Sequence, residues 1–397
     1  MAKDYSPFTP GVPVPLEFFV GREKELSQIL ERAGAAATGR VERVFIIGER
    51  GIGKSSLCQL VRIVSEKEHN LLGLHVHLGG AKSLKEVVHR TFERLLNDSI
   101  ERAWYGRLKE LFKKHIKEVD IFGVRVEFSA NEADLEALVF NFADALRNIL
   151  KQVGNGRKGL LLIFDDLDEL AKSTEFANWL KSFIDGIATS GKALPLLLIL
   201  AGLPEQRVQM IAAQPSLARI FDIVEVTPLT EEETSQFFKQ TFAKVGVKVE
   251  DTALKALYPY TAGYPALAQE IGDAIFKADT DDFISLSDVP RGVMNAVEIV
   301  GRKYIEPQVY AAMKSEKYRS ILDKLSYGPH GVGLLAFKRK DIVKRLEPEE
   351  EKVLDNFLKK MTDLGVLDKD QEHGPGAYKF AKELHFIYFW LKAKPDK

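Results

Sequence analysis

The sequence has only one cysteine, Cys58, among its 397 residues, and this scarcity excludes a disulfide framework and a thiolate metal site. Its longest hydrophobic run, 194–203, contains Pro195 and is far shorter than the roughly 20 residues that span a bilayer. The N-terminus lacks the hydrophobic stretch of a signal peptide. These absences predict a cytoplasmic protein without a membrane segment.

A strong net charge is also missing, since 56 Lys and Arg residues face 57 Asp and Glu residues. The chain as a whole is therefore not attracted to nucleic acid or membranes, and any such contact requires a local patch. A composition of 45% hydrophobic and 28% charged residues is typical of globular proteins, and the length allows two or three domains.

The most informative stretch, residues 41–57, has the pattern of a strand, a glycine-rich loop and a helix. The loop reads G-x-x-x-x-G-K-S, and its glycines let backbone N–H groups and the start of the helix approach one phosphate. A chance glycine-rich turn is the alternative, but the flanking strand and helix argue against it. The predicted nucleotide-binding residues of this loop are Gly48, Glu49, Arg50, Gly51, Ile52, Gly53, Lys54, Ser55 and Ser56.

Two side chains of this loop have specific expected roles. Lys54 is placed to reach the β- and γ-phosphates of a nucleotide, and Ser55 is placed to supply an oxygen ligand to Mg²⁺. Both roles require the phosphates of a bound nucleotide.

A second buried strand, residues 159–164, ends in Asp165, Asp166 and Asp168. A carboxylate at the carboxyl end of a parallel strand lies beside the phosphate loop. We expect Asp165 to hold Mg²⁺ and Asp166 to orient or deprotonate the attacking water. Acids that follow strands also cap helices, but the phosphate loop upstream favours the catalytic interpretation.

Two shorter features precede and follow the loop. Residues 1–17 contain four prolines and are predicted to lie extended over the surface; Val20 and Gly21 then offer an apolar wall for an adenine ring. His75 and His77 fall on one face of a predicted strand at 72–78. This spacing suits a metal, but the sequence places no third ligand nearby, which favours structural histidines.

Residues 99–131 are interpreted as an insertion that forms a charged helix and then a short strand or hairpin, and they are a candidate partner surface. Strands and helices alternate beyond the insertion up to about residue 226, which predicts a parallel three-layer α/β core. The predicted domains are an extended leader at 1–17, a P-loop NTPase core at 18–228, a helical lid at 229–311 and a winged helix at 312–397.

The predicted winged helix consists of helices at 317–325, 337–346 and 348–364 and an extended segment at 365–380. Basic residues at 338–340 lie on the second helix, whereas the third begins with Glu349, Glu350 and Glu351, followed by Asp355. Because acids on a recognition helix would repel phosphate, a structural or protein-binding winged helix is favoured and DNA binding stays an alternative.

Four motifs together resemble the AAA+/STAND superfamily of ATPases, and more closely prokaryotic ATPases related to archaeal origin-recognition initiators. They are Phe-Val-Gly-Arg-Glu at 19–23, Gly-Glu-Arg-Gly-Ile-Gly-Lys-Ser at 48–55, Leu-Ile-Phe-Asp-Asp-Leu-Asp at 162–168 and Gly-Tyr-Pro at 263–265. The resemblance implies that Val20, Gly21 and Arg22 line the adenine, that Pro265 approaches the nucleotide, and that ATP changes the position of the lid.

The resemblance also implies that Arg219 acts as a finger toward the γ-phosphate bound by a neighbouring subunit. It therefore implies a homo-oligomer that depends on nucleotide. The alternative for Arg219 is a local ion pair with Asp222. Two features depart from the pattern. Asp166 replaces the usual glutamate, which predicts slow hydrolysis, and the strand at 198–202 lacks a polar sensor residue, for which Glu205, Gln206 or Arg207 could substitute.

The sequence therefore predicts a Mg²⁺-dependent switch that binds ATP or ADP, hydrolyses ATP and couples its nucleotide state to assembly or to a protein partner. One alternative is a DNA-binding initiator or a transposition-type regulatory ATPase. The other is a scaffold that holds nucleotide with negligible turnover.

Overall fold

The computed structural model describes residues 5–15, 18–99, 105–111, 116–120, 124–154, 156–313, 315–328, 333–370 and 374–393. The chain divides into two compact units. The sheet unit comprises Arg22–Thr227 and contains the large sheet. The helical unit joins Met1–Gly21 to Pro228–Lys397. Within the described ranges, each helix is too short or too polar to cross a membrane.

A five-stranded parallel sheet lies at the centre of the sheet unit, with its strands in the order β2-β5-β6-β1-β7. β5 and β6 are buried along their whole length, as their continuous apolar sequences predict. Asp165 at the end of β5 pairs with Ala201 of β6, and Ile47 at the end of β1 pairs with Gly202. The strands are β1 (Val41–Ile47), β2 (Leu71–His77), β5 (Gly159–Asp165), β6 (Leu196–Gly202) and β7 (Asp222–Glu225).

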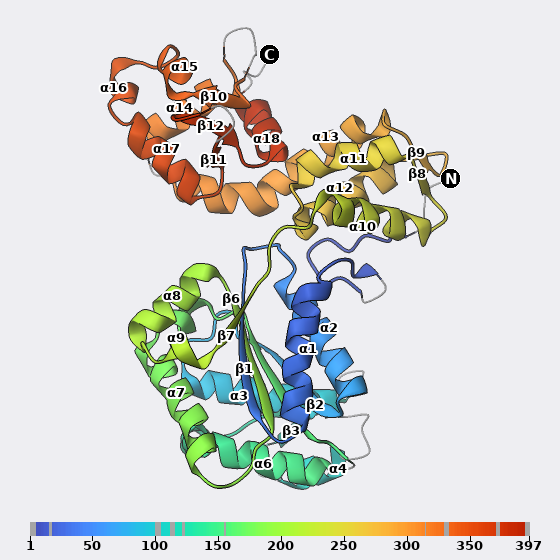
Figure 1. Ribbon diagram of the computed structural model, residues 1–397, viewed down its shortest axis with the longest axis vertical. Helices are drawn as coiled ribbons and strands as arrows, with labels where there is room; N and C mark the ends of the chain where they lie inside the picture. Colours follow the sequence, from blue (N-terminus) through green and yellow to red (C-terminus); the bar gives the residue numbers. More distant parts are fainter. Residues whose placement is uncertain are drawn as a thin grey trace. The chain divides into compact units, whose positions relative to one another are not determined.

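Helices cover both faces of this sheet and complete three layers, as Figure 1 shows. α1 and α2 pack on one face, and α3, α6 and α7 pack on the other, where their apolar side chains join one core with the sheet. The predicted parallel three-layer α/β core is thereby confirmed. The helices of this unit include α1 (Glu23–Ala37), α2 (Lys54–Glu68), α3 (Leu84–Ser99), α6 (Phe142–Val153), the 3₁₀ helix η3 (Asp168–Lys172), α7 (Thr174–Thr189), α8 (Pro204–Ala213) and α9 (Leu217–Ile220).

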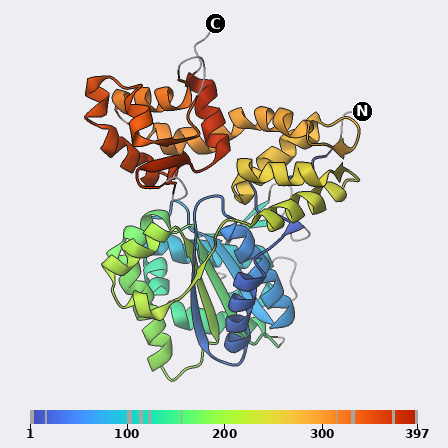
Figure 2. The same ribbon diagram turned by 45° about the horizontal axis from the view of Figure 1, so that its top comes forward.

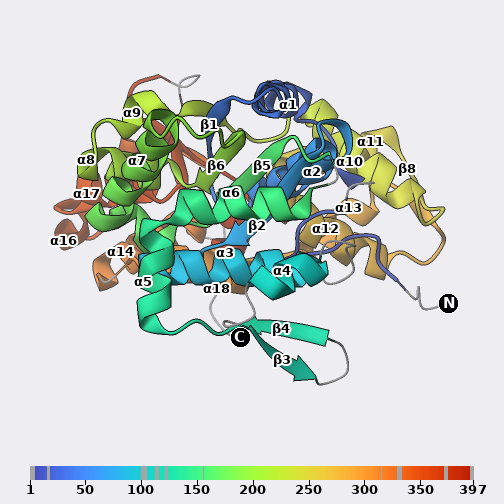
Figure 3. The ribbon, with the colours of Figure 1, turned by 90° about the horizontal axis from the view of Figure 1, so that it is seen from below.

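The insertion contains a short helix, an antiparallel hairpin and a second helix. They are α4 (Tyr105–Leu111), β3 (Ile116–Asp120), β4 (Val124–Phe128) and α5 (Glu132–Phe140). Seen from below, the hairpin projects from the sheet unit beneath α3 and α4 (Figure 3). The predicted hairpin is therefore present, and Phe128 at its end is fully buried against α3, which ties the insertion to the core.

The first part of the helical unit contains α10 (Glu231–Ala243), α11 (Asp251–Thr261), α12 (Pro265–Ala278) and α13 (Asp288–Val300), with a small parallel pair of strands, β8 (Lys248–Val249) and β9 (Phe283–Ile284). Thr230 caps α10 as its sequence predicts: the Thr230 hydroxyl accepts from the backbone N–H of Glu233 at 3.1 Å. A π-helix, η4 (Gly301–Tyr310), continues this part of the chain directly after α13.

The described part of the proline-rich leader lies exposed or half-buried, as predicted, except that Pro7 and Phe8 are buried. Phe8 is 3% exposed and contacts the rings of Phe237, Phe238 and Phe242 on α10. The backbone N–H of Thr9 donates to Oε1 of Gln269 at 2.7 Å. An aromatic anchor between prolines thus fastens the leader into the helical unit. Residues 1–4 and 16–17 of the predicted leader lie outside the described residues.

The last part of the chain combines helices with a three-stranded sheet of order β10-β12-β11. In Figure 2 its orange-to-red elements form a cluster of their own beside the yellow and pale-orange helices of the same unit. Two sequence expectations were wrong here: residues 336–338 form a strand instead of the start of a helix, and the helix expected at 348–364 is split. The elements are α14 (Glu316–Ser326), β10 (Ala336–Lys338), α15 (Arg339–Val343), α16 (Pro348–Glu351), α17 (Leu354–Asp363), β11 (Leu367–Lys369), β12 (Ala377–Phe380) and α18 (Glu383–Ala393).

Candidate functional site

The glycine-rich loop connects β1 to α2 at the carboxyl edge of the large sheet. Gly51 and Gly53 have φ values of +75° and +97°, which side chains other than glycine rarely tolerate, and Gly53 is the N-cap of α2. A Cβ atom at Gly48 would lie 2.7 Å from the carbonyl oxygen of Val226. The three glycines are therefore required by the path of the loop itself, and the loop leads directly into the N-terminus of a 15-residue helix.

Lys54 is the first residue of α2 and its side chain folds back across the loop. Its Nζ donates to the carbonyl oxygens of Gly48 at 2.8 Å and of Glu49 at 2.9 Å. Burial lowers the pKa of Lys54, and the nearby charge of Asp165 opposes that shift. The ammonium group is thus held at the centre of the loop, close to the carboxylate of β5.

Arg22 fastens the loop from a second direction. It has φ +71° at the N-cap of α1 and is 6% exposed. Its Nη2 donates to the carbonyl oxygen of Ile52 at 3.2 Å, and its Nη1 lies 3.4 Å from Oε1 of Glu25. In this structure Arg22, which the resemblance places at the adenine, holds the glycine-rich loop in position through Ile52.

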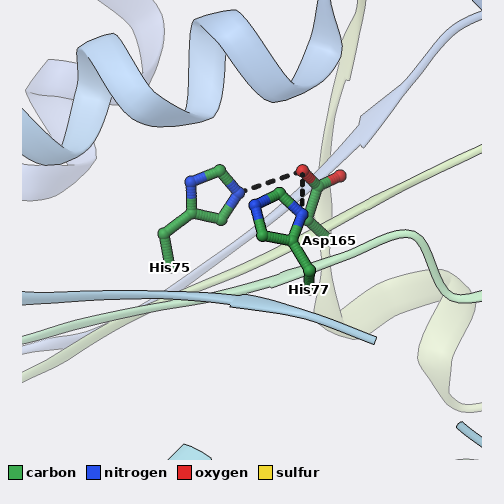
Figure 4. Close-up of side chains that lie close together, drawn as sticks. All are labelled: His75, His77 and Asp165. Atoms are coloured by element: carbon green, nitrogen blue, oxygen red, sulfur yellow. Dashed lines mark hydrogen bonds and ion pairs between the residues drawn. The ribbon is translucent and has the colours of Figure 1, made fainter. Parts of the chain in front are cut away.

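Asp165 is the buried carboxylate of this edge, with only 2% of its surface exposed. His75 Nε2 lies 3.0 Å from Oδ2 of Asp165 and His77 Nδ1 lies 3.5 Å from the same oxygen, as Figure 4 shows. The Ser55 hydroxyl also donates to this carboxylate. Burial by itself would raise the pKa of Asp165, but the hydrogen bonds from His75 and Ser55 hold it below its usual value, so the carboxylate is ionised at neutral pH.

Asp166 and Asp168 follow in a strained turn, with φ values of +64° and +31°. Burial raises the pKa of Asp166, and the neighbouring charge of Asp168 raises it further. Asp166 points toward Gly79, where an added Cβ would lie 2.6 Å from Oδ2. Arg50 of the loop lies 3.9 Å from Asp168. The adjacent acids therefore differ in character, since Asp165 is a stabilised anion and Asp166 a carboxylate that takes up a proton more readily.

The structure brings the predicted site residues Lys54, Ser55, Asp165 and Asp166 together. Ser56, also predicted to bind nucleotide, is instead directed into the protein, with 9% of its surface exposed. Arg219 lies elsewhere in the sheet unit, exposed on α9. Arg219 does not form the alternative ion pair with Asp222. Asp222 pairs with Arg32 instead, with Nη2 of Arg32 3.0 Å from Oδ2 of Asp222. Val20, Gly21 and Pro265 belong to the helical unit.

The substitute sensor residues have separate environments. The Gln206 side chain is buried and its Oε1 accepts from the backbone N–H of Leu203 at 2.8 Å, so it caps the start of α8. Glu205 is exposed at the first turn of the same helix. Gln206 thus has the structural role that the start of a helix predicts.

His75 and His77 are the site residues whose part sequence reasoning missed. They lie on β2, and β2 pairs with β5 so that His77 is opposite Asp165. Asp165 is 88 residues from His77 in the sequence, and only the strand order puts it beside the histidines. The signal in the sequence was the two-residue spacing of the histidines on a strand that could neighbour the acidic one.

Comparison with known proteins adds a family match, two similar structures and one sequence relative. Residues 19–199 match the family described as AAA ATPase domain. A Walker-type ATPase of Pyrococcus abyssi superposes with a TM-score of 0.53 at 16% identity, covering 94% of this chain and 97% of that one. The ORC2 protein of Aeropyrum pernix, in its ADPNP-ADP complexes, superposes with a TM-score of 0.58 at 15% identity, covering 98% and 96%.

A curated sequence relative is an uncharacterized HTH-type transcriptional regulator of Methanocaldococcus jannaschii. It is 23% identical over 229 residues, which are 56% of this chain, and the match spans about half of the relative, 53% of its length. At these identities the two superposed structures show that the fold is shared.

Proposed function

We propose that this chain, which carries an AAA ATPase domain at residues 19–199, is a slow Mg²⁺-dependent ATPase whose nucleotide state controls assembly or partner binding. The observation that carries the proposal is the convergence of Lys54, Ser55 and Asp165 at one edge of the parallel sheet. A cation, a hydroxyl and an ionised carboxylate are the groups that a metal-bound triphosphate needs.

The phosphate loop fits a nucleotide through its backbone. The left-handed glycines at 51 and 53 keep side chains away from the loop surface, and the N-terminus of α2 favours negative charge. Lys54 is already held over the loop by two carbonyl oxygens, and a phosphate oxygen would accept hydrogen bonds that those carbonyls accept now. The loop thus needs little rearrangement to bind the β- and γ-phosphates.

The donor set also fits Mg²⁺, which prefers oxygen ligands. Ser55 offers a hydroxyl and Asp165 a carboxylate whose lowered pKa keeps it ionised. When bound, Mg²⁺ would neutralise charge on the phosphates. Asp165 would hold the ion directly or through water, and His75 would hold Asp165 in place through its hydrogen bond of 3.0 Å.

Asp166 is proposed as the residue that orients and deprotonates the attacking water. Its raised pKa makes it a stronger base than an ordinary aspartate, while its strained backbone fixes where the carboxylate points. Its side chain is shorter by one methylene than the glutamate of similar ATPases. The longer reach to the γ-phosphate supports slow turnover.

Two further parts of the chain are proposed to read out the nucleotide state. Residues 229–311 form the lid, and residues 312–397 form a winged helix, which the three-stranded sheet with α14, α15 and α17 supports. Val20 and Gly21 are proposed to line the adenine, and Pro265 is proposed to approach the nucleotide. The carbonyl oxygen of Gly263 accepts a hydrogen bond from the backbone N–H of Leu229 at 2.9 Å, which holds the first residue of the proposed lid against the Gly-Tyr-Pro motif.

DNA binding is the second candidate, because a sequence relative is described as an HTH-type regulator. The charges favour a protein partner instead. Arg339 Nε pairs with Asp355 Oδ1 at 2.7 Å, and Glu350 accepts from Lys324 and Ser320 at 2.6 Å each. Basic groups that are paired with acids attract phosphate less. Salt-dependent retention of the full chain on duplex DNA would favour the DNA-binding alternative.

Arg219 connects hydrolysis to assembly in this proposal. It is exposed on α9, and its alternative partner Asp222 is bound by Arg32, so Arg219 is accessible to a neighbouring subunit. Arginine fingers in phosphate-loop enzymes contribute roughly 10³ to 10⁵ in rate. We therefore expect specific activity to rise with protein concentration, and Arg219→Ala to bind ATP while losing that rise.

The experiment measures oligomeric state with ATP and with ADP, alongside turnover over a range of concentrations. Lys181→Ala, which removes another cation of the sheet unit, is the matched control and should behave as wild type. Mixing Arg219→Ala with Asp166→Asn should restore activity, because each subunit supplies what the other lacks. Concentration-independent turnover that Arg219→Ala leaves unchanged would contradict the finger, and copurified nucleotide with negligible turnover would favour the scaffold alternative.

A further inference from the structure

His75, His77 and Asp165 bring three metal-ligating side chains to one point of the sheet edge (Figure 4). One ligand atom of each lies within 4.8 Å of the others. Both imidazoles approach the same carboxylate oxygen, at 3.0 and 3.5 Å, and the rings lie 4.5 Å apart between centroids. Three donors thus already face one small volume.

The scaffold behind these donors is rigid. His75 and His77 are two residues apart on β2 and so share a face, while the pairing of β2 with β5 puts Asp165 opposite His77. His75 and Asp165 are 5% and 2% exposed, whereas the His77 side chain is 57% exposed. The cluster therefore has a buried base and one side open to solvent, through which an ion can enter and further ligands can bind.

The distances suit a small dication. Metal bonds of about 2.1 Å to nitrogen and oxygen place neighbouring ligand atoms roughly 3.0 to 3.4 Å apart in octahedral or tetrahedral geometry. The two measured separations from Oδ2 are 3.0 and 3.5 Å, so small side-chain movements complete the geometry. The proton that Nε2 of His75 now directs at the carboxylate would be lost on metal binding.

The donor types select the class of metal. Two imidazoles and one carboxylate with open positions suit Zn²⁺, Fe²⁺ and Co²⁺, whereas Mg²⁺ prefers oxygen ligands. We infer that His75, His77 and Asp165 form a binding site for a transition-metal dication of the zinc class. This site is distinct in its ligands from the Ser55 and Asp165 set proposed for Mg²⁺, with which it shares one carboxylate.

The shared carboxylate gives the site a regulatory consequence that rests on the proposed function. A transition metal on Asp165 would withdraw that carboxylate from Mg²⁺, so zinc-class ions should weaken Mg²⁺-dependent nucleotide binding. The metal site itself does not depend on the proposed function, because it is tested on the protein without nucleotide.

The test titrates Co²⁺ into the full chain, freed of metal and nucleotide, and follows the visible absorption of the bound ion, with Zn²⁺ as competitor. We expect one Co²⁺ per chain with an imidazole-ligand spectrum, displaced by Zn²⁺ at far lower concentrations than by Mg²⁺. His77→Ala should weaken binding by at least about tenfold, since a ligand contributes no less than the outer-shell groups that orient it. His77 is exposed, so this variant should fold.

His69→Ala is the matched control, because His69 lies at the end of α2 in the same unit and outside the cluster. It should bind Co²⁺ as wild type does. Equal binding by His77→Ala and His69→Ala, or displacement of Co²⁺ by Mg²⁺ as readily as by Zn²⁺, would overturn the site. Asp165→Asn provides the second arm and should also lose Co²⁺ binding. These results stand whether or not the protein hydrolyses ATP, since neither ion is measured with nucleotide.

Discussion

Both units of this protein bury polar side chains, but they arrange them differently. In the sheet unit, the buried His75 and Asp165 lie at one edge of the sheet together with the more exposed Lys54 and Asp166, so that acids and cations share a small volume. In the helical unit, buried polar groups are spread through the structure in separate contacts. The sheet unit therefore brings several interacting charged groups to one place, whereas the helical unit keeps such groups in separate pairs.

Glu270 illustrates the distributed arrangement. Its side chain is 3% exposed, and its Oε1 accepts from Lys303 at 2.8 Å and from Tyr304 at 3.2 Å. Burial, together with the charge of Glu270, raises the pKa of Tyr304 to about 12. The contact joins α12 to η4 across 33 residues, and it fastens two helices instead of facing an open edge.

This difference separates the residues expected to serve activity from those expected to serve stability. Like charges and strained residues such as Asp166 cost folding free energy and persist where the surrounding structure fixes them. Paired groups such as Glu270 lose much more when one partner is removed, because the other is left buried and unpaired. Substitutions in the sheet edge should therefore affect activity, and substitutions in the helical unit should affect stability.

The largest expected effect is on turnover. Asp166→Asn should lower kcat by about 10² to 10⁴, because the amide cannot accept the proton of the attacking water, while nucleotide affinity and melting temperature stay near wild type. Steady-state hydrolysis and nucleotide titration measure the two quantities. Wild-type turnover by Asp166→Asn would place the catalytic base elsewhere, with Asp168 the next residue to test.

A smaller effect is expected on the stability of the helical unit. Glu270→Ala should lower its free energy of unfolding by about 2 kcal/mol, since Tyr304 and the half-exposed Lys303 lose their acceptor, and ATP affinity should not change. Denaturant unfolding measures the loss. Glu298→Ala is the control, because Glu298 and Arg302 are 68% and 69% exposed and their pair should contribute under about 1 kcal/mol. Equal losses in both variants would remove the distinction between buried and exposed pairs.

Over a single pH unit, the smallest effect is a dependence of stability on pH. Burial lowers the pKa of His385 from about 6.5 to about 3. Between these values the unfolded chain binds a proton that the folded helical unit excludes, so stability is complete above pH 6.5 and falls by about 1.4 kcal/mol for each pH unit below it. His385→Leu should flatten that slope, measured as unfolding free energy against pH. The same slope in the variant would assign the acid sensitivity to another group.

The sequence predicted the sheet unit better than the helical unit, for a physical reason. The strand, loop and helix at 41–57 and the acidic end of β5 are specified by local patterns, and the structure places them together. The burial of Phe8 and the approach of His77 to Asp165 depend on chain segments far apart in the sequence. Local periodicity carries no information on which strands become neighbours.

The C-terminal elements show a second limit of the sequence. Residues 336–338 pair with β12, and this tertiary hydrogen bonding overrides the helical spacing that predicted a helix from residue 337. The long helix expected from residue 348 stops at Glu351, and α17 begins at Leu354. In both places, packing within the helical unit determined whether residues formed a helix, and local sequence propensity did not.

The central claim is that the edge of the sheet unit binds the phosphates of ATP through Lys54. Its most direct test is the ATP affinity of Lys54→Ala beside Lys67→Ala, which removes an exposed cation from the other end of the same helix. Lys54→Ala should keep its fold and lose about 100-fold or more in ATP affinity, because about 3 kcal/mol of charge-assisted hydrogen bonding is removed. Lys67→Ala should bind ATP as wild type does. Wild-type ATP affinity in a folded Lys54→Ala protein would contradict it.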